Sequence, residues 1–462
     1  MSESSTEKKG LTSFLKHYGF LLPNAEIYGG LAKSWDLGPY GAELKRNLKN
    51  LWWKYFITSS SYNVGCDSQI ITHPQVLEAS GHRKNFHDWL VECRQCRKRY
   101  RLDNLISAKE FAIFLEKKDK SSYLIKDNCR KCGKNNFCPP RQFNLLMATN
   151  LEITEGKENT VYLRPETCQG IFVNFPAIQR STHRQLPFGI GQIGKSFRNE
   201  ITLHHGIFRT REFEQLELEF FCQGEESEKW WNYWTKKAWN FLQKIIVNER
   251  KKIKQVDLEK EELPHYSKKT QDLYFNYHFG WGEVCSNSHR GNYDLSQHGQ
   301  HSRKDFRVNG IIPEVVESSF GVERLMLAVL EDAYQEETVA SSQLTREVLR
   351  LHPLLAPYFV AVIPLEKSLR EKSCQLYHEL LKNPFFSVAY EETGNIGNRY
   401  RRQDAIGTYY CLTLDKQTLQ DNTITLRHRD SMKQEPERIS IDNVKNYLNS
   451  LYEKYWQEFT AE

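Results

Sequence analysis

The most regular hydrophobic pattern in the chain follows Pro39. Apolar residues recur there at intervals of three and four, at Leu44, Leu48, Leu51, Trp52 and Tyr55. This spacing places side chains on one face of a helix. Pro39 stands near the start, where its missing N–H leaves no helical hydrogen bond unmade. The pattern predicts one amphipathic helix over residues 39–56.

Later segments predict two domains. A run rich in aromatics and lysines, without Pro or Gly, predicts a helix over 230–254, and a turn-like run follows over 255–264. A charged helix is expected after Leu330. Pro353 and Pro357 then mark a change in the residue pattern that indicates a domain boundary. Beyond them we expect strands over 358–365, 409–414 and 422–428 and helices over 366–382 and 441–458. The sequence therefore predicts a large domain over 1–350 and a smaller mixed α/β domain over 351–462.

Two charged segments in the middle of the chain read as strands, over 196–201 and 209–221. With a period of two, one face of the first carries Arg198 and Glu200, and one face of the second carries Arg211, Phe213, Gln215, Glu217 and Glu219. An aromatic ring flanked by charges suits a purine, its phosphates and a cationic amine. The high Glu content leaves a charged amphipathic helix open as the alternative.

A third segment joins a strand to a helix. Residues 312–317 read as a strand, and apolar residues at helical spacing between Ser318 and Leu330 predict the helix. Gly321 and Arg324 would lie in its first turns, near the positive end of the helix dipole, where a phosphate can bind. A helix that merely packs on a sheet is the alternative.

Four of the eleven cysteines form two pairs with metal-ligand spacing, Cys93 with Cys96 and Cys129 with Cys132. Two such pairs can hold one tetrahedral ion, and four thiolates leave no position open for substrate. We therefore expect a structural zinc in a polar insertion over residues 88–141, with Cys138 as a bystander. Four unrelated cysteines are the alternative.

Composition narrows the class of protein. The 462 residues exceed one compact core, and no apolar stretch approaches the roughly 18 residues of a membrane span. The first ten residues lack the apolar segment of a secretory signal, so we expect a soluble, cytoplasmic protein with no membrane association. The net charge of +6 permits a polyanionic partner without requiring one.

Three of the segments described above resemble the three motifs of class II aminoacyl-tRNA synthetases. Residues 39–56 resemble motif 1, residues 197–221 motif 2 and residues 317–324 motif 3. Within this class the chain is similar to the homodimeric glycyl-tRNA synthetases, through residues 34–41, 163–172, 280–283 and 395–407. The resemblance implies an α/β (α+β) fold: an antiparallel-sheet catalytic domain with a zinc-knuckle insertion, followed by an anticodon-binding domain.

The resemblance also implies roles for residues. It assigns ATP to Arg198, Asn199, Glu200, Phe208, Arg211, Phe213, Glu283, Val284, Gly321 and Arg324, with Mg²⁺ near Glu283. It assigns glycine to Arg101, Glu166, Phe213, Glu217, Glu317 and Ser319. Arg198, Glu200 and Arg324 would be the catalytic residues. The implied partners are ATP, glycine, tRNA-Gly and a second copy of the chain.

The implied chemistry needs no protein nucleophile. A glycine carboxylate is ionised at neutral pH and attacks the α-phosphorus of ATP directly, while arginines and Mg²⁺ neutralise charge. The tRNA 3′-hydroxyl then attacks the glycyl-adenylate. We expect the C-terminal domain to read the anticodon through Arg399, Arg401, Arg402, Arg427 and Arg429, among Tyr400, Tyr409 and Tyr410.

The chain departs from the family in three places: the motif 2 loop over 201–206, Ser318 in place of a proline, and residues 286–288. Two rival functions remain. A synthetase-like accessory subunit of a DNA polymerase would have lost the phosphate-binding arginines, and both Arg198 and Arg324 are present. A synthetase for another amino acid is disfavoured by Glu166, Glu217 and Glu317.

Overall fold

A seven-stranded sheet forms the centre of the large domain. The computed structural model describes residues 7–31, 33–151, 160–201, 203, 205–338 and 345–461. The strand order is β12 (Ile253–Asp257), β13 (Lys269–Tyr277), β14 (Gly280–Gly291), β15 (Glu314–Gly321), β11 (Glu212–Cys222), β10 (Phe188–Phe197) and β3 (Asn63–Gly65). Neighbours are antiparallel except for β10 and β3. The antiparallel sheet expected for this domain is confirmed.

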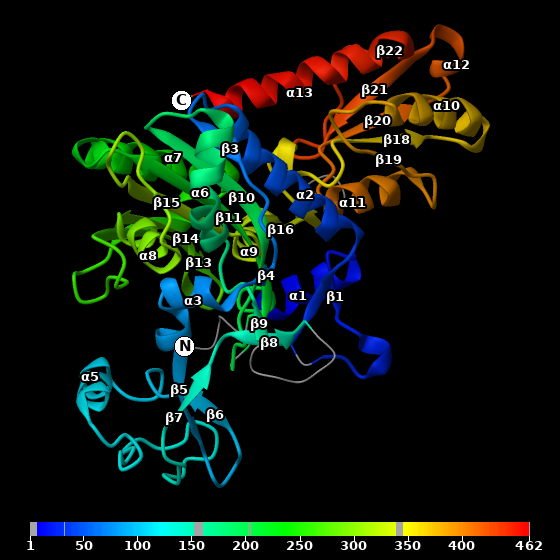
Figure 1. The fold of residues 1–462 in the computed structure, drawn as a ribbon. Coiled ribbons are helices and arrows are strands. Elements are labelled where there is room, and N and C mark those ends of the chain that lie inside the picture. The colour runs from blue at the N-terminus through cyan, green and yellow to red at the C-terminus, as the bar shows by residue number, and fades with distance from the viewer. Residues whose placement is uncertain are drawn as a thin grey trace.

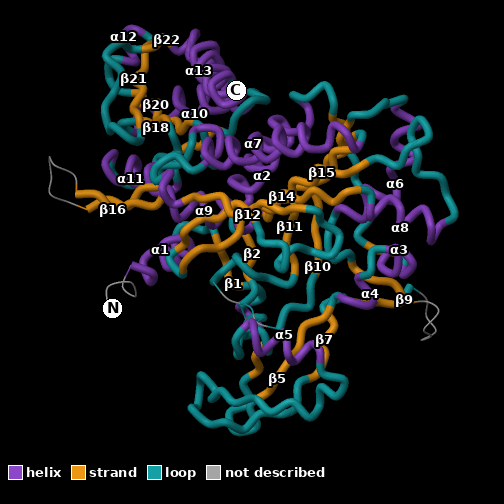
Figure 2. The backbone as a smooth tube through the Cα atoms, turned by 90° about the vertical axis from the view of Figure 1, so that its left-hand side faces the viewer, coloured by secondary structure: helices purple, strands orange, loops and turns teal. Residues whose placement is uncertain are grey.

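Three helices pack along one face of this sheet (Figure 2): α2 (Pro39–Trp53), α7 (Ser227–Ile245) and α9 (Val322–Ala333). The helix predicted over 39–56 is confirmed as α2, which continues as a π-helical turn over Lys54–Thr58. Leu216, Leu218 and Phe220 of β11 face these helices. The opposite face of β11 therefore carries its odd-numbered residues.

The aromatic residues of α2 and the turn after it are covered within the chain itself. Trp52 and Phe56 are each 0% exposed and Tyr55 is 6% exposed. Phe56 contacts Trp234 of α7 and Phe320 of β15. From the sequence alone, these apolar rings would favour a subunit interface at α2, but α7 and the sheet already cover them within one chain.

The N-terminal part and a small sheet flank the centre. α1 (Glu7–His17) precedes the hairpin of β1 (Leu21–Pro23) and β2 (Trp35–Leu37). β4 (Ile71–Thr72), β9 (Thr160–Leu163) and β8 (Met147–Asn150) form a second sheet beside α3 (Pro74–Ala79) and α4 (His82–Asn85). α6 (Cys168–Thr182) and α8 (Tyr293–Ser302) pack together, and α6 contacts β10 and β11.

The cysteine-bearing insertion projects from the body of the molecule (Figure 1). Its sheet has the order β6 (Arg99–Arg101), β5 (His87–Glu92), β7 (Arg141–Asn144), and α5 (Ala108–Glu116) packs beside it. Val91, Leu102 and Phe114 belong to a separate small core. The insertion thus has its own hydrophobic interior.

The C-terminal part forms a five-stranded mixed sheet of β19 (Val388–Tyr390), β18 (Val360–Pro364), β20 (Tyr410–Leu414), β21 (Thr423–His428) and β22 (Ile439–Ser440). Its helices are α10 (Arg370–Leu381), α11 (Ile396–Ile406), α12 (Thr418–Asp421) and α13 (Val444–Thr460). The predicted α/β character is confirmed. α13 crosses back to the large domain (Figure 1), where Phe459 contacts Tyr55 and Phe241. Removing residues 351–462 would therefore expose the core of the large domain.

One predicted helix ends earlier than expected, and another is wrong. α7 ends at Ile245 rather than residue 254, because the Asp332 carboxylate accepts the backbone N–H groups of Val247, Asn248 and Glu249 at 2.8–3.0 Å. The turn-like run after it begins as β12. The charged segment after α9 is a hairpin of β16 (Tyr334–Thr338) and β17 (Thr345–Leu349), in which Arg346 binds Glu337 and Asp404. Among the described residues, no helix has the length and apolar character of a membrane span.

Candidate active site

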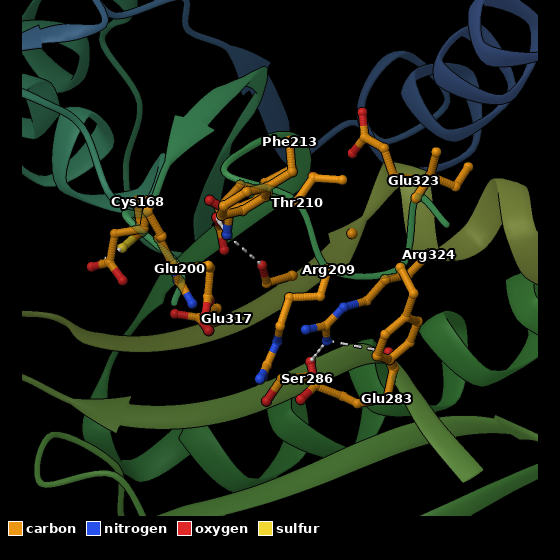
Figure 3. A pocket seen from close by; sticks show the side chains of 18 of the residues that line it. Cys168, Glu200, Arg209, Thr210, Phe213, Glu283, Ser286, Glu317, Glu323 and Arg324 are labelled. Atoms are coloured by element: carbon orange, nitrogen blue, oxygen red, sulfur yellow. Dashed lines mark hydrogen bonds and ion pairs between the residues drawn. The ribbon is translucent and has the colours of Figure 1, made fainter. Parts of the chain in front are cut away.

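One cavity of about 330 Å³ gathers most of the predicted site residues (Figure 3). It lies over the odd-numbered face of β11 and is lined by Glu166, Cys168, Arg198, Glu200, Phe208, Arg209, Phe213, Gln215, Glu217, Tyr266, Glu283, Ser286, Arg290, Glu317, Ser319, Gly321, Glu323 and Arg324, among others. Glu317 and Cys168 lie at one end in Figure 3, and Arg324 with Glu283 lies at the other. The cavity is therefore polarised.

The strands place these side chains by their alternation and register. β11 is a strand, which excludes the charged helix, and Glu217 pairs with Ser319 of β15. The first strand ends at Phe197, so Arg198 and Glu200 lie in the loop after it and not on a strand face as predicted. Ser318–Gly321 likewise belong to β15, and the helix α9 begins only at Val322, with Gly321 at its N-cap.

Buried carboxylates dominate one end of the cavity. Glu217 is 1% exposed, and it accepts hydrogen bonds from Thr167 Oγ1 at 2.6 Å and from Gln215 Nε2 at 3.1 Å. Glu317 pairs with the Arg290 guanidinium, which also binds Asp294 at 2.8 and 3.0 Å. Glu166 accepts hydrogen bonds from Cys168 Sγ and Gln169 Nε2, each at 3.0 Å. Three carboxylates thus converge on one small space.

These carboxylates differ in how readily they ionise. Burial and the neighbouring Glu317 raise the pKa of Glu217 to about 8. Burial also raises the pKa of Glu317, against the opposing effect of Arg290. Burial opposes ionisation of Glu166 too, but His82 and Arg290 together hold its pKa well below the ordinary value. The carboxyl groups at this end outnumber its cations, Arg290 and His82, and a bound cation would relieve this excess of negative charge.

Arginines line the remainder of the cavity. The Arg198 guanidinium lies 5.3 Å from the ring centres of both Phe86 and Phe213, and its Nε donates to Pro165 O at 3.0 Å. Arg324 donates to Glu283 Oε1 at 2.9 Å and lies 4.8 Å from the Phe208 ring centre. These guanidiniums and rings form a surface suited to phosphates and a flat base.

The glycine before Glu283 allows Phe208 to approach this strand. A Cβ atom at Gly282 would lie 2.8 Å from carbons of the Phe208 ring and 2.9 Å from the Tyr277 ring. Any side chain at Gly282 would therefore displace Phe208, which in turn packs on Arg324.

Four predicted site residues do not line the cavity. Arg211 lies instead in a separate hollow with Lys33, Arg97, Lys98 and Arg99, because β11 begins at Glu212 and its alternation does not extend back to residue 211. Arg101 pairs with Asp103 at 2.7 Å and with Asp88 at 3.3 Å.

The other two, Asn199 and Val284, lie outside the cavity for different reasons. Asn199 donates its backbone N–H to Leu145 O at 2.8 Å. Val284 is 0% exposed and belongs to the main hydrophobic core. In the motif 2 loop, Leu203 O accepts from Lys33 Nζ at 2.8 Å, while residues 202 and 204 lie outside the described part of the chain.

The structure adds residues that sequence reasoning missed. Arg290 orients Glu317, and Thr167 orients Glu217. Arg209 enters the cavity (Figure 3), and among the described residues nothing accepts a hydrogen bond from its Nε. The Arg209-Thr-Arg211 sequence predicted an arginine side chain at this site, but it did not show which of the two arginines faces the cavity. Arg290 lies 27 positions before Glu317, so only the fold pairs them.

The two cysteine pairs meet in the insertion. The four Sγ atoms lie within 4.8 Å of one another, and Cys93–Cys132 and Cys96–Cys129 are separated by 3.6 and 3.5 Å. Tetrahedral zinc with Zn–S bonds of about 2.3 Å separates its sulfurs by about 3.8 Å. The cluster therefore fits zinc, and Cys138 is not part of it.

Several residues expected to contact the anticodon are interior. Arg427 is 6% exposed and binds Asp404 through two nitrogens at 2.8 and 2.9 Å. Arg429 is 2% exposed and donates to Leu351 O and Gly407 O. Tyr410 is also buried, whereas Arg401 is exposed. Arg427 and Arg429 therefore stabilise the domain and are not available to RNA.

Comparisons with known proteins agree with this architecture. Residues 151–333 match the family described as tRNA synthetase class II core domain (G, H, P, S and T), and residues 359–451 match the anticodon binding domain family. A solved prolyl-tRNA synthetase from Cryptosporidium parvum, complexed with halofuginone and AMPPNP, aligns with a TM-score of 0.63 over 100% of this chain and 80% of that chain. At 11% identity, this likeness shows the fold alone.

Two curated relatives extend the agreement to nearly the whole chain. A glycine–tRNA ligase from Mycoplasma mycoides subsp. mycoides SC is 48% identical over 453 residues, which span 96% of this chain and 98% of the relative. One from Caldanaerobacter subterraneus subsp. tengcongensis is 48% identical over 95% of this chain and 97% of the relative. The polarised cavity, the two matched domains and this identity lead to one conclusion: the chain belongs to the glycine–tRNA ligase family of class II aminoacyl-tRNA synthetases.

Proposed function

We propose that the cavity binds glycine at its acidic end and ATP at its arginine-bearing end, so that the glycine carboxylate meets the α-phosphate between them. The family's reaction joins glycine to tRNA-Gly with ATP and Mg²⁺. The observation that carries the assignment is that Glu166, Glu217 and Glu317, all buried or nearly so, line the same end of one cavity. Desolvating an ammonium group requires paired negative charge of this kind.

We assign the ATP contacts from the arginines and rings. Arg198 and Arg324 neutralise phosphates, Phe213 stacks on adenine, and Glu200 accepts from its amino group. Arg209 supplies a further phosphate contact, since its Nε is otherwise unpartnered among the described residues. Arg211, Arg101, Asn199 and Val284 are not part of this assignment as side-chain contacts. Alignment and charge neutralisation are the whole catalytic contribution, because the glycine carboxylate is itself the nucleophile.

Mg²⁺ fits beside Glu283. Asp272 lies near it, is 6% exposed, and leaves Oδ1 without a partner among the described residues. Burial and Glu283 raise the pKa of Asp272 to about 6. Mg²⁺ typically takes one or two carboxylates together with substrate phosphates, and two oxygen donors here match that preference.

A substitution pair tests the division of the cavity. Glu317→Asp retracts one carboxylate, so the glycine KM in ATP–pyrophosphate exchange should rise while the ATP KM changes little. Arg324→Lys removes the forked guanidinium and should raise the ATP KM with little effect on glycine. If the two variants affect glycine and ATP equally, the two ends do not have separate roles.

We also propose a structural zinc at Cys93, Cys96, Cys129 and Cys132, a cytoplasmic location and a homodimer. The dimer is supported by three exposed apolar side chains between β1 and β2: Ile27 and Tyr28 are each 87% exposed and Leu31 is 59% exposed. Such a cluster is typical of a protein–protein contact. Light scattering at micromolar concentration should report twice the chain mass, and Tyr28→Asp should shift it toward the monomer. A monomeric parent protein would contradict the assignment.

A further inference from the structure

A fourth buried carboxyl lies directly behind the acidic end of the cavity. Glu219 is 0% exposed and follows Glu217 by two positions on β11, so both side chains face the same side of the sheet. In the sheet register Glu219 pairs with Glu317 of β15. Glu217 and Glu317 line the cavity, whereas Glu219 does not. Glu219 is thus positioned to act on the glycine site only through its neighbours.

Glu219 is buried without a partner. Neither of its carboxyl oxygens has a hydrogen-bond partner among the described residues. One of its oxygens, a Glu317 oxygen and Cys168 Sγ lie within 4.8 Å of one another. The nearby cation, Arg290, directs its nitrogens to Asp294 and Glu317. An ionised Glu219 would be an unpaired charge beside another carboxylate, which is strongly unfavourable in the interior.

The charges around Glu219 favour its neutral form. Burial and Glu317 raise its pKa well above the ordinary value, with Glu217 and Asp294 adding to the effect and Arg290 opposing it. A neutral carboxylic acid carries one O–H donor, whereas an ionised carboxylate only accepts hydrogen bonds. Of the groups around it, the carboxylate of Glu317 is the stronger acceptor, since Cys168 Sγ already donates to Glu166.

We propose that Glu219 is a positioning residue for glycine, a buried neutral acid whose hydroxyl group donates a hydrogen bond to the Glu317 carboxylate from behind while Arg290 holds that carboxylate from the side. Glu317 then presents its oxygen to the glycine ammonium in a fixed direction. The inference rests on the proposed assignment of the glycine site.

A purely space-filling role makes a different prediction. An apolar side chain of similar size would bury no polar atoms, so Glu219→Leu should leave a space-filling position as stable as before or more stable. If Glu219 positions Glu317, the same substitution should damage glycine binding although the fold survives. Glu219→Gln serves as the matched control, because it keeps an uncharged side chain with a hydrogen-bond donor.

The experiment compares both variants of the full chain by ATP–pyrophosphate exchange. Glu219→Leu should raise the glycine KM about tenfold, the equivalent of one hydrogen bond to a charged group, with the ATP KM and the melting temperature unchanged. Glu219→Gln should retain a glycine KM close to that of the parent protein. Infrared spectra at neutral pH should contain a protonated-carboxyl C=O band in the parent that is weaker in Glu219→Gln, where the contribution of Glu217 remains.

Three results would overturn the inference. An unchanged glycine KM in Glu219→Leu would show that Glu219 only fills space. A glycine KM raised equally in Glu219→Gln would show that the ionised form is needed. A carboxylic band of equal intensity in the parent and in Glu219→Gln would exclude the neutral acid, even if the Leu variant failed to fold. Glu317→Asp separates the two proposals: if Glu317→Asp raises the glycine KM and Glu219→Leu does not, only the role of Glu219 is refuted.

Discussion

Glycine binding is expected to release a proton from Glu217. In the empty cavity, burial and Glu317 raise the pKa of Glu217 to about 8, so this carboxyl is mostly protonated at neutral pH. In the proposed site the glycine ammonium binds the ionised carboxylate of Glu217, so this group must lose its proton when glycine binds. Lowering the pH favours the protonated form, which competes with glycine. The affinity for glycine should therefore fall as the pH falls below about 8 and level off above it.

The expected size follows from this pKa. If only the ionised form binds glycine, the apparent dissociation constant rises about tenfold for each pH unit below the pKa, which is about 1.4 kcal/mol per unit. Affinity should therefore be about tenfold below its limit at pH 7 and about hundredfold below it at pH 6. At pH 7 about nine-tenths of a proton should leave per glycine bound.

Titration calorimetry measures both quantities. The heat of glycine binding in buffers of different ionisation enthalpy gives the number of protons released, and the same titrations across the pH range give the affinity. Glu217→Gln stays neutral at every pH, so it should bind glycine weakly and release no proton. ATP binding measured over the same range is the control for the rest of the cavity. A glycine affinity that is constant between about pH 6 and about pH 8, without proton release, would refute the reasoning.

Three further predictions concern selectivity, the metal and tRNA. Ser319 lines the proposed glycine site, and its Oγ accepts a hydrogen bond from Gln215 Nε2 at 3.3 Å. Ser319→Gly should therefore open space beside the glycine α-carbon and allow alanine-dependent exchange. If alanine exchange stays at background while glycine exchange is intact, the steric barrier lies elsewhere. The purified protein should contain about one zinc per chain, and Cys129→Ser should lower both the zinc content and the melting temperature; a fully stable, active variant would exclude the structural role. Arg401 is exposed on α11, so Arg401→Glu should raise the KM for tRNA and leave glycine-dependent exchange unchanged, whereas equal loss of both would contradict a role in tRNA binding.

Short-range sequence patterns correctly predicted a helix, one strand face and the cysteine cluster. The spacing of Leu44, Leu48 and Leu51 determined α2, and the period of two placed Phe213 and Glu217 on one face of β11. The paired cysteine spacing predicted a cluster that the fold closes. In each case the information lies within a few residues of the chain.

The predictions failed where the outcome depends on a distant residue or on the exact start of an element, neither of which the local pattern reveals. The pattern of α7 continues past Ile245, but the Asp332 carboxylate binds the backbone beyond it and ends the helix. Arg211 shares the parity of Phe213, yet it precedes the strand and turns to another hollow. The arginines and tyrosines around Arg427 suggest RNA binding, and only the fold shows that its guanidinium is already hydrogen-bonded to Asp404.

ATP–pyrophosphate exchange measured with each protein amino acid in turn tests the central claim most directly, because it reports which amino acid the carboxylate cavity activates. The account predicts exchange with glycine and background rates with alanine, serine and all larger amino acids, since in the proposed site three carboxylates bind the ammonium and Ser319 excludes a side chain. Exchange with alanine or serine at a rate comparable to glycine, or no exchange with glycine, would contradict it.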